Sequence, residues 1–246
     1  MHWIHILVPQ DDEMLAVPGK PFPKYEDIII NGDGLDDPEI KAVIDFESAE
    51  GEALLDYLQN NTGRVIDSPN VLLLIEDALL IEKDNDLDLS AWTDSGFEQY
   101  LVPLTSIIFD IWGSSQYMKI RTSALFKDMT NRLDNLIAGS DDQKMLLYSA
   151  HDATVGGMLH FLGIRDQTVA KSSYAASLNL ELYENSEIED DNEVKRIFQL
   201  LYFTSYVGEN PVEINIADCQ APCPYKRFKI NIKRKLIPDY GSACSL

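Results

Sequence analysis

A short apolar run between two polar segments places the tightest limit on how this chain can fold. Residues 144–150 (Lys-Met-Leu-Leu-Tyr-Ser-Ala) follow a polar loop at 139–142 and lead directly into His151 and Asp152. A short apolar run flanked by turn residues is typical of a buried strand. Helical spacing resumes at Thr154 and continues to Leu162. The pattern therefore predicts a buried strand followed at once by a helix.

The rest of the chain divides into a helical first half and an α/β second half. Apolar residues at helical spacing and alternating apolar residues distinguish the two kinds of element. The stretches with helical spacing lie at 40–58, ending at Gly63, at 71–83, and at 94–138 with an interruption at 113–115. Strands are expected at 178–183 and 194–206, joined by an acidic tip at 187–193.

Charge and hydropathy exclude several classes of partner. The 246 residues include 41 acidic and 20 basic side chains, which gives a net charge of −21. Such a surface repels nucleic acid and anionic lipid, so we expect neither as a partner. No apolar run reaches the roughly 18 residues of a membrane span. The first nine residues lack the basic start and apolar core of a signal peptide.

The junction between the expected strand and helix, at His151 and Asp152, is the best candidate for chemistry. Ligands of open α/β sheets bind beyond the carboxyl ends of strands, and the start of a helix favours an anion. Histidine can donate a hydrogen bond to that anion, and aspartic acid can protonate a leaving group. The alternative is structural: Asp152 caps the helix and His151 packs against its neighbours.

Two acidic loops resemble calcium sites, but each lacks required ligands. In residues 31–36 a leucine stands at the fifth position, where an oxygen ligand is needed. Residues 84–89 lack the glycine of the sixth position, and no glutamate follows at the twelfth. We therefore expect no bound metal, and a calcium-binding protein is the weakest of the functions considered.

The cysteines and one Asn-x-Thr triplet bear on the compartment. Three residues separate Cys219 from Cys223, and no second pair follows at zinc spacing. A small disulfide-closed loop is expected, which implies an oxidising compartment. Residues 60–62 (Asn-Asn-Thr) match a glycosylation acceptor. Such triplets are common by chance, so this one supports a secretory route only weakly.

The residues around the junction resemble a known enzyme family. Residues 148–155 (Tyr-Ser-Ala-His-Asp-Ala-Thr-Val) are similar to the His-Asp motif of the histidine acid phosphatases, in their prostatic and lysosomal branch. The resemblance continues at 174–178, and residues 219–228 look like the family's short disulfide loop. It covers nearly the whole chain, from about Ile6 onward.

The resemblance implies an α/β fold of the phosphoglycerate-mutase-like (histidine phosphatase) type, with helices flanking the sheet and a helical cap. It implies a single incomplete domain over 1–246 that is N-terminally truncated and lacks the N-terminal strands. The mainly helical cap would cover about 20–130, and the α/β core remainder about 131–246. A strand missing from the sheet would leave unpaired backbone and apolar surface.

The family's chemistry is hydrolysis of phosphate monoesters through a covalent phosphohistidine, without a metal or other cofactor. Carried over, His151 contacts the phosphate and Asp152 is the general acid. The family's nucleophile lies in an Arg-His-Gly motif, and no histidine of this sequence is followed by glycine. Because phosphoryl transfer depends on the nucleophile and on cations around the phosphate, we expect little or no turnover. The alternative is a catalytically dead pseudo-phosphatase that acts as a binding protein.

The resemblance also sets expectations for location, assembly and a second disulfide. It implies a lysosomal or secreted protein that binds phosphate monoesters or phosphate, as a monomer or a homodimer. Cys219 and Cys223 match the family's local disulfide. Cys244 resembles a cysteine that pairs with an early one in the family, whose place Phe22 takes here. That second bridge should therefore be absent.

Overall fold

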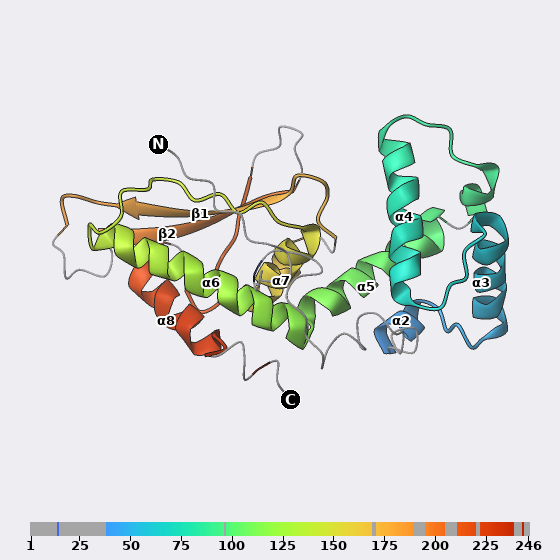
Figure 1. The fold of residues 1–246 in the computed structure, drawn as a ribbon, viewed down its shortest axis with the longest axis horizontal. Helices are drawn as coiled ribbons and strands as arrows, with labels where there is room; N and C mark the ends of the chain where they lie inside the picture. Colours follow the sequence, from blue (N-terminus) through green and yellow to red (C-terminus); the bar gives the residue numbers. More distant parts are fainter. Residues whose placement is uncertain are drawn as a thin grey trace. The chain divides into compact units, whose positions relative to one another are not determined.

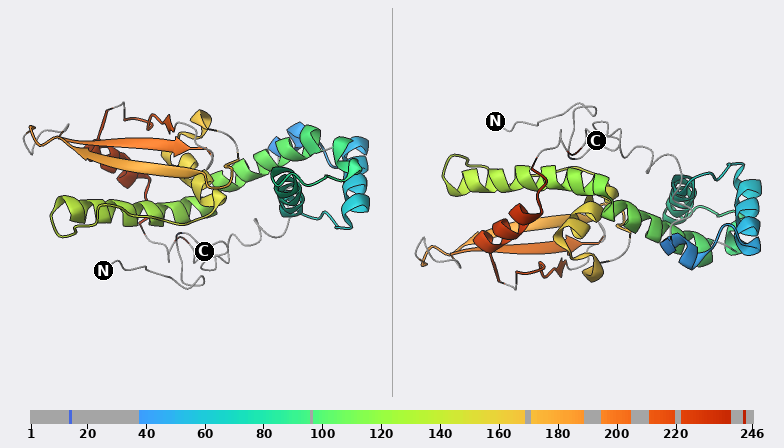
Figure 2. Two further views of the ribbon diagram at one scale, coloured as in Figure 1. Left: turned by 90° about the horizontal axis from the view of Figure 1, so that it is seen from above. Right: turned by 90° about the horizontal axis from the view of Figure 1, so that it is seen from below.

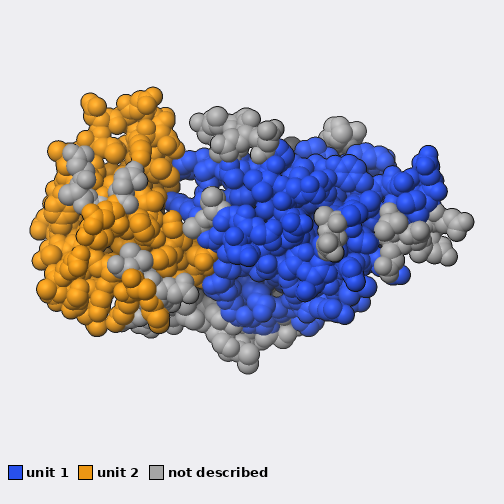
Figure 3. Space-filling model, turned by 180° about the vertical axis from the view of Figure 1, so that it is seen from behind, with its two compact units in different colours: residues 1–22, 113–246 blue, residues 23–112 orange. Residues whose placement is uncertain are grey.

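The chain forms two compact units, each described here by itself. The structure is a computed structural model, and it describes Met14, Ala243 and residues 38–95, 97–168, 171–188, 195–204, 211–219 and 222–238. One unit takes in residues 1–22 and 113–246, and the other residues 23–112 (Figure 3). Helices and a small antiparallel sheet make this a mixed α/β protein. The phosphoglycerate-mutase-like arrangement and the division into cap and core stay predictions.

The unit of residues 23–112 is helical throughout its described part. Its elements are α2 (Pro38–Val43), α3 (Ala49–Thr62), α4 (Pro69–Asp84), the 3-10 helix η3 (Ala91–Ser95), the π-helix η4 (Phe97–Leu101) and most of α5 (Val102–Ser114) (Figure 1). The hydroxyl of Ser48 caps α3 by accepting a hydrogen bond from the backbone nitrogen of Gly51 at 3.1 Å. Helix α3 ends at Gly63, whose φ of 67° suits glycine. The predicted stop at Gly63 is confirmed.

Aliphatic side chains from these helices form a core of their own. Leu72 of α4 and Leu104 of α5 are completely buried. Leu58 of α3 and Leu101 of η4 are nearly so. Burial of each such leucine contributes about 1.5–3 kcal/mol. The helical spacing at 71–83 therefore marks a real buried face.

The second unit combines helices with the sheet. Its elements are α6 (Gln116–Ile137), α7 (Asp152–Leu162), the 3-10 helix η5 (Arg165–Gln167), β1 (Ser177–Glu184), β2 (Arg196–Phe203), β3 (Val212–Glu213), β4 (Cys223–Pro224) and α8 (Tyr225–Lys235). Strand β2 pairs antiparallel with β1, β3 and β4. Strands β1 and β2 confirm the two predicted strands, although part of the predicted acidic tip lies outside the described residues.

One face of the sheet carries the core of this unit. Side chains alternate across a strand, so Phe198, Leu200 and Tyr202 of β2 share a face and all three are buried. Leu180 and Leu182 of β1 lie opposite Leu200 and Phe198 on that face. Helices α6, α7 and α8 supply the rest of the core (Figure 2). Sheet and helices thus form the two packed layers that an α/β unit needs.

The break between α5 and α6 falls within the predicted interruption. Helix α5 ends at Ser114, and Ser115 caps α6 by accepting a hydrogen bond from the backbone nitrogen of Met118 at 3.2 Å. Helix α6 carries Phe126, which is completely buried and stacks on Phe161 of α7 at 4.9 Å between ring centres. The predicted helix over 94–138 is therefore confirmed as two α-helices, preceded by 3-10 and π turns.

Polar contacts attach α8 to the rest of its unit. The Tyr225 hydroxyl donates to an Asp134 carboxylate oxygen at 3.1 Å, and Lys229 forms a salt bridge with the same carboxylate. Burial and the neighbouring Asp134 charge raise the pKa of the Tyr225 hydroxyl. The Lys235 ammonium donates to the carbonyl oxygens of Phe161 and Leu162, at the C-terminus of α7. A cation at that end is favourable.

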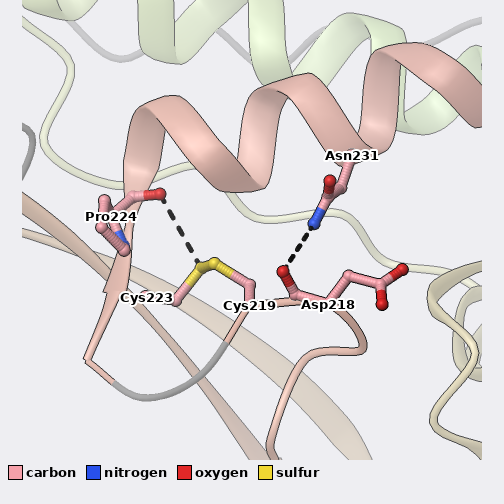
Figure 4. The surroundings of a disulfide bond; sticks show 5 residues. All are labelled: Asp218, Cys219, Cys223, Pro224 and Asn231. Atoms are coloured by element: carbon pink, nitrogen blue, oxygen red, sulfur yellow. Dashed lines mark hydrogen bonds between the residues drawn. A yellow bond between two sulfur atoms is a disulfide. The ribbon is translucent and has the colours of Figure 1, made fainter.

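The small disulfide loop is present as predicted. Cys219 and Cys223 are bonded to each other directly before α8 (Figure 4). The side-chain amide of Asn231 in α8 donates to the carbonyl oxygen of Asp218 at 3.3 Å, which attaches the loop to the helix. Cys244, Phe22 and the acidic loop at 31–36 lie outside the described residues. Within the described chain, no helix is both long and apolar enough to cross a bilayer.

Candidate active site

The backbone that precedes His151 runs back from the end of α6 toward its first half. Figure 1 shows it as a yellow-green trace from α6 to the start of α7. The prediction of a buried strand at 144–150 is wrong: the segment has no strand, and Met145 and Leu147 are 77% and 82% exposed. Within the described chain, no backbone–backbone hydrogen bond reaches these residues. A strand needs a neighbour, and β1, β3 and β4 all pair with β2 instead.

Tyr148 anchors this segment to α6. Its hydroxyl donates to a carboxylate oxygen of Asp128 at 2.6 Å. The Arg132 guanidinium donates to the same oxygen at 2.9 Å, one helical turn further along. Burial and the hydrogen bond to Asp128 raise the pKa of the Tyr148 hydroxyl, because both favour its neutral form. The Asp128–Tyr148–Arg132 cluster thus fixes the chain three residues before His151.

His151 and Asp152 lie side by side at the start of α7, and both are exposed. His151 is the N-cap residue, but its side chain makes no cap hydrogen bond. Asp152 is the first helical residue, and its carboxylate accepts a hydrogen bond from the backbone nitrogen of Ala153 at 2.7 Å. The structural alternative thus holds in part for Asp152, because its carboxylate accepts a hydrogen bond from a backbone nitrogen in the first turn of α7. His151 is exposed and lies outside the core of its unit.

Close packing of α7 on α6 holds this helix start in place. A Cβ atom at Gly157 would lie 2.8 Å from the hydroxyl oxygen of Thr122 and 3.0 Å from the terminal methyl of Met118. Only glycine allows the two helices to approach this closely. The Thr122 hydroxyl is buried there with no hydrogen-bond partner in the described structure. Helix α7 therefore packs tightly on α6, with Ala153 and Thr154 buried and only His151 and Asp152 exposed at its start.

The site consists of a hydrogen-bond donor and a proton donor at a helix N-terminus. The backbone N–H groups of Ala153 and Thr154 already donate to the Asp152 carboxylate and the His151 carbonyl oxygen, so the helix dipole is what favours an anion at this position. His151 can donate to an oxyanion, and Asp152 can exchange a proton with a ligand. The arrangement therefore suits a small anion that takes up a proton as it reacts.

Several arginines that could bind an anion have structural contacts instead. Arg121 is buried in α6, where it donates to the Tyr117 hydroxyl at 3.1 Å and lies over the Tyr117 ring. Arg132 pairs with Asp128. Arg196 pairs with Glu184 across β1 and β2. These contacts commit three arginines of this unit to holding the fold.

Sequence reasoning did not identify the residues that support the site. Asp128 and Arg132 stand four residues apart in a helix, at the spacing of a surface ion pair. That spacing could have suggested the pair, but their contact with Tyr148 crosses 20 residues of sequence. The loop between α6 and α7 brings Tyr148 to Asp128, and the course of that loop cannot be predicted from a local sequence pattern.

Comparisons with known proteins agree with the resemblance to acid phosphatases. No protein-family model matches the chain. The chain is 24% identical to lysosomal acid phosphatase of Bos taurus over 250 residues and 23% identical to that of Homo sapiens over 248. It is 22% identical to testicular acid phosphatase of Mus musculus over 251 residues. These similarities support an acid phosphatase family.

The alignments take in nearly all of this chain but only part of each relative. They cover 99% of the chain against the two lysosomal enzymes and 98% against the testicular enzyme. The chain spans about 55% of the length of the curated relatives it matches. The similarity therefore extends over nearly the whole of this chain, but it involves only about half of each acid phosphatase.

Proposed function

We propose that this chain carries the proton-donating half of a phosphomonoesterase site. The exposed His151–Asp152 pair at the first turn of α7 is the observation that carries the proposal. His151 donates a hydrogen bond to a phosphoryl oxygen, and Asp152 gives its proton to the departing alcohol. The ligand is a phosphate monoester or phosphate, and the chemistry uses no metal. Similarity to acid phosphatases along nearly the whole chain supports this assignment.

These 246 residues alone have little or no turnover. None of the four histidines precedes a glycine, so the Arg-His-Gly nucleophile of the histidine acid phosphatases has no counterpart. Stabilisation of the equatorial phosphoryl oxygens by cations supplies most of the catalysis in phosphoryl transfer. Arg121, Arg132 and Arg196 are held in contacts elsewhere in the fold. The chain therefore binds the anion without completing the reaction.

The remaining family expectations belong to the same proposal. The helical unit of residues 23–112 overlaps most of the predicted cap over about 20–130. The names of the relatives point to a lysosomal or secreted protein. The disulfide between Cys219 and Cys223 fits that oxidising route.

The test combines an activity assay with inorganic phosphate binding. Hydrolysis of p-nitrophenyl phosphate is measured at acid pH, and phosphate is titrated while backbone amide NMR signals of Ala153 and Thr154 are followed. We expect no turnover and saturable shifts. His151→Ala removes one hydrogen bond to the charged phosphate, worth about 1.5–3 kcal/mol, and should weaken phosphate binding about 10- to 160-fold. The matched control Asp142→Asn changes an exposed acid on the preceding loop and should leave binding unchanged.

Two results would contradict different parts of this proposal. The proposed anion site would be contradicted if the amide signals did not respond to phosphate, or if they responded equally in His151→Ala. If the chain hydrolyses the ester and Asp152→Asn abolishes this turnover, Asp152 is supported as the proton donor. The same result contradicts the expected inactivity.

A binding protein without catalysis is the second candidate, and the exposed Met145 and Leu147 favour it. Large apolar side chains that lie together at the surface are typical of interaction sites. This candidate predicts a cooperative thermal transition and a defined monomer or homodimer in sedimentation velocity. It binds a partner or an anion without hydrolysis.

A further inference from the structure

The Asn-Asn-Thr triplet at 60–62 occupies the last turn of α3, in the helical unit. Asn60 is exposed. It lies four residues after Asp56 and eight after Glu52, which are exposed on the same side of the helix. Leu58, the buried contact of α3 with the core, is two residues away and therefore turned by roughly 200° around the helix axis. A bulky group on Asn60 would extend into solvent without touching the core.

The helix ends within the triplet itself. Thr62 is the last residue of α3, and its hydroxyl donates to the Leu58 carbonyl oxygen at 2.7 Å. Gly63 follows in the left-handed conformation and stops the helix. Helix ends fray, and local opening there costs little free energy. The triplet can therefore leave the helix and bind a transferase in extended form, and then return to its place.

A second observation, independent of α3, concerns the compartment. Cys219 and Cys223 form a disulfide, and disulfides persist in oxidising compartments such as the lumen of the secretory pathway. Asn-x-Thr triplets are modified in that same lumen, where the sugar sits on a surface position. Surface exposure, a triplet at a helix end and an oxidised cysteine pair together point to one modification.

We propose that Asn60 carries an N-linked glycan. The donor is a lipid-linked oligosaccharide pyrophosphate. The side-chain amide nitrogen of Asn60 forms a bond to C1 of the first sugar, and the bond from that carbon to the pyrophosphate oxygen breaks. The amide loses one proton, and the lipid pyrophosphate leaves. The reaction involves no oxidation or reduction, and it is independent of phosphate binding at His151.

The experiment compares intact mass before and after peptide-N-glycosidase treatment of the protein purified from its own source. Treatment in H2(18)O labels the released position as aspartate, and peptide mass spectrometry then locates it. We expect one glycan on most molecules, at Asn60 and not at Asn61. Disulfide formation between Cys219 and Cys223 is read from their own peptide in the same digest.

Variants expressed in that source separate the acceptor from its surroundings. Asn60→Gln and Thr62→Ala should abolish the glycan. Asn61→Gln is the matched control, because it removes the neighbouring amide and leaves the acceptor triplet intact; Thr62→Ser keeps the hydroxyl and should also retain the glycan. Protein with an unmodified Asn60 would overturn the proposal, and so would a glycan that persists in Asn60→Gln. Neither result affects the phosphate titration.

Discussion

Removal of the Tyr148 hydroxyl tests how the segment before the site is held. The substitution Tyr148→Phe keeps the ring, which packs against the core of its unit, and deletes the 2.6 Å hydrogen bond to Asp128. A hydrogen bond to a charged group contributes about 1.5–3 kcal/mol. Asp128 keeps Arg132 as a partner, and its side chain is 29% exposed, so water replaces part of the loss. We therefore expect a loss of about 1–2 kcal/mol in the free energy of unfolding.

The assay is urea unfolding together with peptide-resolved hydrogen exchange. The exchange data should show faster opening of residues 142–151 in Tyr148→Phe and little change in the unit of residues 23–112. The matched control is Tyr183→Phe, which removes the hydroxyl of an exposed tyrosine bonded to Glu181. Its effect should stay within about 0.5 kcal/mol.

A double-mutant cycle decides whether the pair itself is responsible. Asp128→Asn and Tyr148→Phe should couple by about 1 kcal/mol, because the two side chains share one hydrogen bond. A loss in Tyr148→Phe no greater than in Tyr183→Phe would refute the reasoning. Coupling indistinguishable from zero would refute it as well, since the segment would then be held by other contacts.

Three further predictions concern the same unit. The pKa values of Tyr148 and Tyr225 are raised in the folded protein, so folding favours both protonated hydroxyls. Their contribution to the free energy of unfolding should be fully present below about pH 10 and decline above it. Above that pH the melting temperature should fall less steeply in the variant with both tyrosines changed to Phe. Phe126→Ala removes a fully buried ring and should cost about 3–5 kcal/mol in urea unfolding. Brief trypsin digestion should cleave after Lys144, whose backbone has no hydrogen-bonded neighbour among the described residues, before it cleaves after Lys127 within α6; early cleavage at Lys127 would contradict this assignment.

Local patterns were enough to predict most elements of the fold. Gly63 ends α3 because a left-handed residue stops a helix. The Gly-Ser-Ser stretch at 113–115 divides α5 from α6 because serine caps a helix start. Strand β2 alternates between buried and partly buried side chains, so its period of two was visible in the sequence; β1 was predicted from its alternating apolar residues, although its burial does not alternate strictly. The disulfide followed from cysteines with no further partner at metal spacing.

The segment at 144–150 shows the limit of such patterns. Its composition predicts burial, but burial of a strand depends on neighbours that lie elsewhere in the sequence. The position of His151 and Asp152 at the start of a helix was predicted, because the spacing after Thr154 is local. The Asp128–Tyr148–Arg132 cluster was not, because a hydrogen bond between a helix and a returning loop has no periodic signal. The roles assigned to His151 and Asp152 stay predictions.

The backbone at 144–150 has a consequence for how the protein behaves at high concentration. Among the described residues its N–H and C=O groups pair with no other backbone, and such groups beside exposed Met145 and Leu147 favour edge-to-edge aggregation. The net charge of −21 opposes that association by mutual repulsion. At physiological ionic strength such repulsion extends only about 8 Å, and about 3 Å in 1 M salt. Colloidal stability of this protein should therefore depend on salt, with solubility lost as ions screen the acidic surface.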